Sequence, residues 1–144
     1  MLETPPPSQL SQVISQSIAP AFILGAVASF ISVLVTRLNR IIDRCRLLAG
    51  RDQNQGSPDL VGVADISRLN ARAKLINRAI IWAVGSALST LLLMIVAFVS
   101  AFLELPHERG VGFLFLVALV LFGASLTYFG KEVRIVIKDP NNFD

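Results

Sequence analysis

The chain has 144 residues and a net charge of +3, and its composition is strongly apolar: 53% of the residues are hydrophobic, 16% are charged and the mean hydropathy is +0.64. A soluble domain carries about 25% charged residues, so this composition argues against a soluble protein. The length fits one domain and excludes two independent hydrophobic cores.

Three runs without Asp, Glu, Lys, Arg or His divide the chain: Thr4–Thr36, Ala79–Leu103 and Gly110–Gly130. A helix of about 20 apolar residues crosses the hydrocarbon core of a membrane, which is about 30 Å thick. The second and third runs reach that length, and in the first run residues 18–36 do so. The sequence therefore predicts an all-α integral membrane protein. It is a single membrane domain, residues 1–144, with three transmembrane helices at 18–36, 79–103 and 110–130.

The segment before the first span, residues 1–17, is rich in proline, serine and glutamine. Pro5, Pro6 and Pro7 predict that it starts in an extended, mobile conformation. It contains no lysine or arginine, and the apolar sequence continues through Val35. Because a signal peptide has a basic start and a shorter apolar stretch, we expect a retained span.

Between the first two spans, residues 37–78 hold nine basic and four acidic residues. Apolar residues recur there at alternating steps of three and four: Leu38, Ile41, Cys45 and Leu48, then Ile66, Leu69, Ala73, Ile76 and Ile80. This spacing is typical of helices that pack side by side. Gly50, and Ser57 followed by Pro58, predict a turn. We expect spans one and two to continue into an antiparallel helical hairpin, with Cys45, the only cysteine, packed inside it.

The distribution of basic residues predicts the orientation. The short turn 104–109 holds two acids and one arginine, whereas Lys131, Arg134 and Lys138 lie in the tail, residues 131–144. Basic residues mark the cytoplasmic side of a membrane. We therefore expect the hairpin and the C-terminus in the cytoplasm, and the N-terminus and the 104–109 turn outside.

A first group of candidate site residues lies where spans one and two leave the membrane. It consists of Arg37, Asn39, Arg40, Asp43, Arg44, Asn77 and Arg78. Basic residues beside an anionic leaflet contribute about 1 kcal/mol each to binding, so the group predicts contact with an anionic lipid, an ion or a partner. Fixing the orientation is an alternative role that accounts for the same arginines.

A second group, Gly25, Ser29, Ser32 and Thr36, shares one face of the first span. Small residues at this spacing let helices approach closely, which predicts a packing face. The alternative is the wall of a pore in an oligomer. Gln12 and Gln16 would then also meet water, with Arg37 and Arg40 as rings at the inner mouth.

Several classes of function are disfavoured. No nucleophile–base pair or pair of carboxylates falls at a common depth, so we expect no enzyme and no cofactor. Glu104, His107 and Glu108 are an ordinary polar set for a turn, and we predict no metal site. The three spans lack charged residues, which argues against a proton-coupled transporter. The basic residues lack an aromatic platform, which argues against nucleic acid.

Three stretches of the chain carry a resemblance to a known family: Ser17–Gly25, Thr36–Arg44 and Leu75–Ile80. They resemble the small bacterial membrane proteins grouped as domain of unknown function 2721. The most specific stretch reads Thr-Arg-Leu-Asn-Arg-Ile-Ile-Asp-Arg. The resemblance covers residues 18–138 and implies a three-helix protein of the bacterial inner membrane. It brings no known activity, ligand or catalytic residue.

Three functions are left open by the sequence. The first is a non-enzymatic homo-oligomer whose basic hairpin contacts anionic membrane lipid or a cytoplasmic partner. The second is an oligomeric ion channel with a pore lined by the first span. The third is an accessory subunit of a larger membrane complex, which the small size of the chain suggests.

Overall fold

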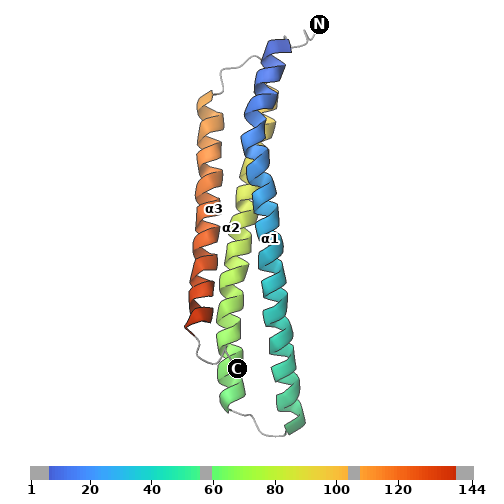
Figure 1. The fold of residues 1–144 in the computed structure, drawn as a ribbon, viewed down its shortest axis with the longest axis vertical. Helices are drawn as coiled ribbons and strands as arrows, with labels where there is room; N and C mark the ends of the chain where they lie inside the picture. Colours follow the sequence, from blue (N-terminus) through green and yellow to red (C-terminus); the bar gives the residue numbers. More distant parts are fainter. Residues whose placement is uncertain (1–6, 56–59, 104–107, 139–144) are drawn as a thin grey trace. The chain divides into compact units, whose positions relative to one another are not determined.

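The computed structural model describes residues 7–55, 60–103 and 108–138, which form three helices (Figure 1). These are α1 (Pro7–Gln55), α2 (Leu60–Phe102) and α3 (Glu108–Ile137), and no strand occurs in the described ranges. Each helix contains a stretch that is long and apolar enough to cross a membrane: Ile14–Gly50, Ala64–Ser100 and Gly110–Ile137. The prediction of an all-helical protein with three such helices is confirmed.

The helices extend further than the sequence predicted. α1 begins at Pro7, within the expected extended segment, because proline at a first helical position gives up only an N–H that has no partner in the helix. α1 also passes through Gly50, where a turn was expected, and ends at Gln55. Gly50 is exposed and its backbone is not left-handed, so it costs the helix only about 1 kcal/mol. α3 continues past Gly130, and the first half of the expected tail is therefore helical. Four residues used above to predict the extended segment and the turn lie outside the described residues: Pro5, Pro6, Ser57 and Pro58.

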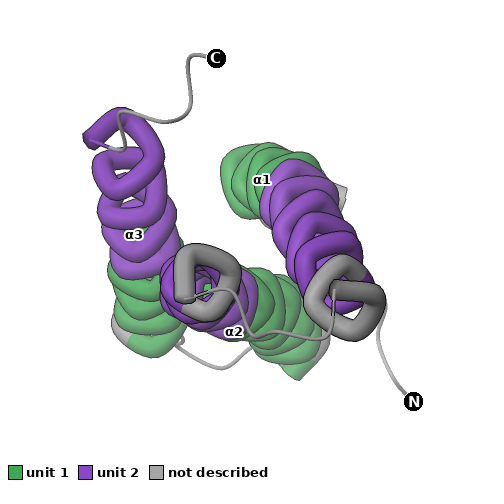
Figure 2. The backbone as a smooth tube through the Cα atoms, turned by 90° about the horizontal axis from the view of Figure 1, so that it is seen from below, with its two compact units in different colours: residues 1–30, 82–123 green, residues 31–81, 124–144 purple. Residues whose placement is uncertain are grey.

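The chain forms two compact units, each made from one piece of every helix (Figure 2). Unit 1 comprises residues 1–30 and 82–123, and unit 2 comprises residues 31–81 and 124–144. Each unit is thus a three-helix assembly in its own right.

Buried residues recur at every seventh position on each helix. The series are Pro20, Val27, Leu34 and Ile41 on α1; Leu69, Ile76, Ala83 and Thr90, and also Ala79, Ser86, Leu93 and Ser100, on α2; and Ala118, Ser125 and Glu132 on α3. A seven-residue repeat returns the same face of a helix every two turns, which is the spacing that lets long helices pack along their length. The apolar series predicted between residues 38 and 48 and between residues 66 and 80 are buried or half-buried.

In unit 1 the helices pack through small and aromatic residues. The Ser86 hydroxyl on α2 donates a hydrogen bond of 2.8 Å to the carbonyl of Ala118 on α3. Phe30 on α1 meets Phe122 on α3 edge to face, with ring centroids 5.8 Å apart. A hydroxyl that bonds to a neighbouring backbone carbonyl and a small residue at the contact are typical of helix pairs in membranes.

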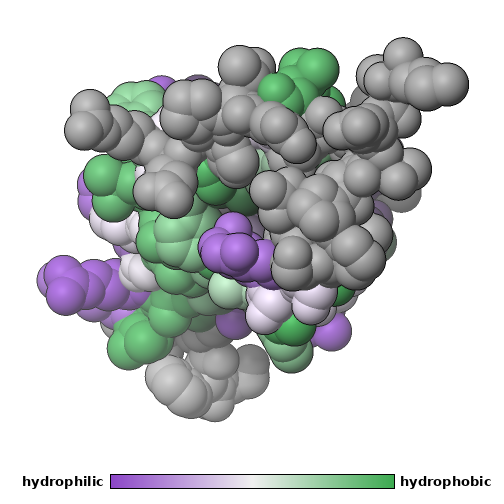
Figure 3. All heavy atoms as spheres, turned by 90° about the horizontal axis from the view of Figure 1, so that it is seen from above, coloured by the Kyte–Doolittle hydropathy of each residue, from purple (hydrophilic) through white to green (hydrophobic). Residues whose placement is uncertain are grey.

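The outer surfaces of the helices are apolar. In the most apolar window of the three spans only 17%, 28% and 11% of the residues are buried, and large side chains such as Phe22 and Val120 are 75% and 63% exposed. Apolar residues reach the surface in the view of Figure 3. A monomeric soluble protein rarely exposes apolar patches of this extent, so the surface suits helices surrounded by lipid.

Candidate functional site

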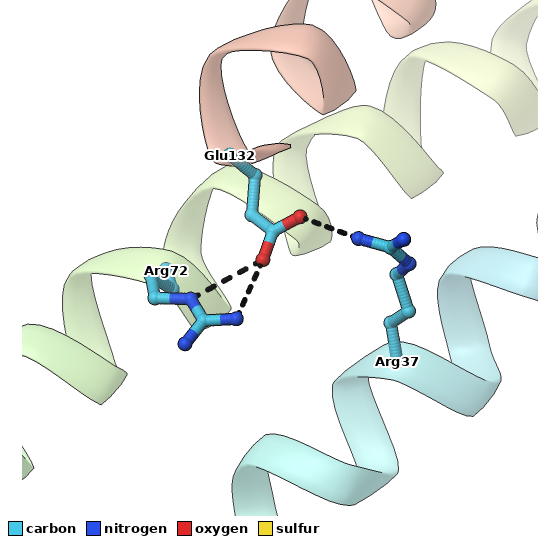
Figure 4. A network of polar contacts seen from close by, with 3 residues as sticks. All are labelled: Arg37, Arg72 and Glu132. Carbon is cyan, nitrogen blue, oxygen red and sulfur yellow. Dashed lines mark hydrogen bonds and ion pairs between the residues drawn. The ribbon is translucent and has the colours of Figure 1, made fainter. Parts of the chain in front are cut away.

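Glu132 is the central residue of the candidate site in unit 2, and only 1% of its side chain is exposed. It lies seven residues after Ser125, so it belongs to the buried series of α3. Its Oε1 accepts hydrogen bonds from Nε and NH2 of Arg72 on α2, at 3.2 and 3.0 Å. Its Oε2 accepts one from NH1 of Arg37 on α1, at 3.2 Å (Figure 4). One carboxylate therefore joins all three helices of the unit.

The two arginines explain how a carboxylate is tolerated at this position. A buried charge is very unfavourable unless it is paired and its lone pairs accept hydrogen bonds, and Glu132 meets both conditions. The arginines are only partly buried, because their side chains are 20% exposed at Arg72 and 43% exposed at Arg37. Two guanidinium groups and one carboxylate leave this triad with a net positive charge.

A second contact fixes the Arg37 side chain. Its guanidinium carbon lies 5.0 Å from the ring centroid of Phe129, one turn before Glu132 on α3. A cation over an aromatic face gains about 0.5–1 kcal/mol at an exposed position and more where it is desolvated. Arg37 is thus held by both a carboxylate and a ring of the same helix.

The position of the triad follows from the packing of α2 against α3. The Ser125 hydroxyl donates a hydrogen bond of 2.6 Å to the Ala79 carbonyl. Arg72 lies seven residues before Ala79, and Glu132 lies seven residues after Ser125, so two antiparallel helices bring them to the same level. Arg37 follows directly on the first uncharged run, and Glu132 follows closely on the third. The triad therefore lies where the apolar runs of α1 and α3 end.

The rest of the predicted basic cluster lies at the surface. Asn39, Arg40, Asp43, Arg44, Asn77 and Arg78 are all exposed. Only Arg37 of that group has a described ion pair, and its partner is on α3 rather than across the expected hairpin. The cluster is consequently a charged surface around one ordered arginine.

The predicted small-residue face is also exposed. Gly25, Ser29, Ser32 and Thr36 lie on the outside of α1, whose buried positions are instead Val27 and Leu34. The Thr36 hydroxyl donates a hydrogen bond of 2.9 Å to the Ser32 carbonyl of its own helix. The described parts of α2 and α3 therefore do not cover this face.

The sequence analysis missed Glu132 and Arg72 as site residues. Glu132 lies just beyond the third apolar run and looks like one charge of a mixed tail. The spacing Ala118–Ser125–Glu132 was the available signal, since it carries the small-residue series of α3 onto an acid. Among the residues that the structure describes, no three histidine, cysteine, aspartate or glutamate side chains gather as metal ligands. The predicted polar set around His107 falls outside the described side chains.

A comparison with known proteins places these features in one family. The family model described as "Protein of unknown function (DUF2721)" matches residues 17–141, which include all three members of the triad. No curated protein and no solved structure matches the chain. Because the match covers most of the sequence, the chain belongs to the DUF2721 family of proteins of unknown function.

Proposed function

We propose that the chain is a non-enzymatic multi-pass protein of the bacterial inner membrane that binds anionic lipid through unit 2 and assembles as a homo-oligomer. The observation that carries this proposal is the excess of exposed basic side chains in unit 2. These are Arg40, Arg44, Arg46, Arg68, Lys74, Arg78, Lys131, Arg134 and Lys138, against the exposed acids Asp43 and Asp65 in the described part of the unit. Each such cation near an anionic leaflet contributes about 1 kcal/mol.

In this proposal, the basic part of unit 2 lies on the cytoplasmic side. Residues 37–78, at the end of α1 and the start of α2, form an antiparallel hairpin in the cytoplasm, and the C-terminus lies on the same side. The excess of basic residues in this part of the chain supports that orientation.

The orientation is tested by labelling single cysteines in a Cys45→Ser background. Asp65→Cys in α2 and Gly110→Cys at the start of α3 are both at exposed positions. An impermeant maleimide should label position 110 on intact spheroplasts and position 65 only on inverted membrane vesicles. Labelling of position 65 on sealed spheroplasts would overturn the proposed orientation.

Lipid binding is tested by comparing phosphatidylglycerol with phosphatidylcholine. The purified protein in a neutral detergent should retain phosphatidylglycerol preferentially, as counted by native mass spectrometry. The preference should weaken with added salt, because the attraction is electrostatic. Equal retention of the two lipids at low salt would refute an anionic-lipid function.

The uncovered face of α1 supports the homo-oligomer. Gly25, Ser29 and Ser32 are small and exposed. Apart from its chain neighbours and the nearby backbone of α1, no atom of the described residues lies within 4 Å of the position that a Cβ on Gly25 would take. Such a face lets a second helix approach closely. A mass measurement of the assembly in native lipid should give two or more times the 15.6 kDa of one chain. Ser29→Leu should lower the number of chains in the assembly. A wild-type protein that stays monomeric in lipid would remove this part of the proposal.

The exposed hydroxyls of the same face favour one alternative, an oligomeric channel lined by α1. Ser29 and Ser32 would then face water in a pore, with Arg40 as the ring at its inner mouth, since Arg37 is engaged with Glu132. Planar-bilayer recordings on purified protein test the channel directly. Unitary currents that Ser29→Leu abolishes would favour it, and silence under all voltages and tensions would exclude it.

A further inference from the structure

Glu132 is shared unequally between its two arginines. Arg72 directs two nitrogens at Oε1, whereas Arg37 directs one nitrogen at Oε2. A guanidinium carries five N–H donors. Four donors of Arg37 therefore have no acceptor within the described part of the chain, although the group itself is fixed by Glu132 and Phe129.

This arginine is prepared for a ligand in three respects. Its side chain is 43% exposed, so a ligand can reach it. Its carboxylate partner is already paired with Arg72, so the triad keeps a positive charge that attracts an anion. Because two contacts hold the guanidinium, a ligand does not have to immobilise a free side chain on binding.

Arg40 adds a second donor group beside the first. It is exposed and lies three residues after Arg37, on the same side of α1. Asp43 is the nearest acid along this surface of the helix, and in the described part of the structure it forms no ion pair with Arg37 or Arg40. Arg37 follows directly on the uncharged run of α1 and Arg40 lies one turn further on, which is the level where the hydrocarbon of a membrane would end.

We propose that Arg37 and Arg40 bind a phosphate group, that of an anionic membrane lipid, beside α3 in unit 2. The planar fork of a guanidinium matches the oxygens of a phosphate, and lipid phosphates lie just outside the hydrocarbon. Glu132 and Phe129 act as positioning residues that orient Arg37. This inference rests on the proposed lipid-binding function and names the seat of that binding.

The experiment measures the affinity of the purified protein for phosphatidylglycerol by native mass spectrometry. Arg37→Gln should weaken binding about tenfold, and Arg40→Gln several-fold, as expected for the loss of a charge-assisted hydrogen bond. Arg46→Gln is the matched control, because Arg46 is exposed and nine residues after Arg37, on the opposite side of α1. It changes the net charge equally and should alter the affinity less than about twofold if contact rather than overall charge decides.

Further arms separate the possible failures. Arg40→Gln leaves the triad intact, so its effect cannot come from loss of the contacts to Glu132. Arg37→Lys keeps the positive charge facing Glu132 but loses the planar guanidinium group, and it should also bind phosphatidylglycerol less well. A wild-type protein with no preference for phosphatidylglycerol over phosphatidylcholine refutes the proposed function itself. A preference that the Arg37, Arg40 and Arg46 variants all reduce equally leaves lipid binding in place and overturns this site. Inorganic phosphate that competes with the lipid, and whose binding depends on Arg37 in the same way without lipid, would identify a free phosphate as the ligand and overturn the lipid assignment.

Discussion

Replacing Glu132 by glutamine should destabilise the protein far more than the loss of one charge at the surface. Glutamine has nearly the same volume, but only one of its two terminal atoms is an acceptor. The carbonyl oxygen can accept from one arginine, the amide NH2 then faces the N–H donors of the other arginine, and neither contact remains an ion pair. Removing one partner of a buried ion pair costs about 3–5 kcal/mol. Because Arg37 and Arg72 are 43% and 20% exposed and can turn toward water, we reduce this to about 2–3 kcal/mol.

The assay is reversible unfolding in mixed micelles with a rising fraction of dodecyl sulfate, followed by the fluorescence of Trp82, the only tryptophan. Asp65→Asn is the control, since Asp65 is an exposed acid of the same unit and should change stability by less than about 0.5 kcal/mol. A cycle with Arg72→Gln should show coupling to Glu132→Gln of about 1 kcal/mol or more. Two results would show that the triad does not hold the three helices. One is that Glu132→Gln unfolds at the same dodecyl sulfate fraction as Asp65→Asn. The other is that the stability losses of Glu132→Gln and Arg72→Gln are additive in the double variant.

The remaining predictions concern the packing of the helices, and the same unfolding assay measures all of them. Ser125→Ala removes a buried hydroxyl that bonds α3 to α2 and should cost about 0.6–1.5 kcal/mol; no loss would mean that the carbonyl of α2 finds another donor. Ala118→Leu should cost about 1–3 kcal/mol, because Ala118 is fully buried, whereas Val120→Leu on the exposed side should be neutral; equal effects would contradict the assigned faces of α3. Phe122→Leu and Phe30→Leu should be coupled by about 0.5–1.5 kcal/mol, and purely additive losses would show that the edge-to-face contact contributes nothing beyond its area.

The apolar runs predicted the number and the class of the helices correctly, because crossing hydrocarbon requires about 20 apolar residues whatever the packing. Helix ends were less predictable. Pro7 is compatible with a helix because it stands at the first helical position, and the cost of about 1 kcal/mol at Gly50 is too small to end a helix of 49 residues. The residue types at these positions give the local free-energy cost of helix formation, but they do not determine where the helix ends.

The packing faces were predictable only from the seven-residue spacing. Gly25 and Ser29 suggested close contact by their size, yet α1 buries the larger Val27 and Leu34 within the chain. In a membrane, large apolar and small residues differ little in the free energy of contact with lipid. Residue type alone therefore says little about which face of a helix packs against the other helices. Glu132 could have been placed by its register with Ser125, which composition and charge counts do not reveal.

The seven-residue repeat of α3 allows more than one alignment of α3 along α2, and Glu132 selects one of them. Ala118 and Ser125 are both small, so moving α3 along α2 by two turns would exchange similar surfaces at little cost. In one direction such a slip would set the Ser125 hydroxyl against Arg72, and in the other it would bring a carboxylate beside Ala79 without a cation. Both alignments leave a charged side chain without its ion-pair partner. A polar residue at one position of a coiled coil selects the correct alignment of the helices in the same way. Glu132 alone thereby makes one alignment of α2 and α3 more favourable than the alignments shifted by two turns.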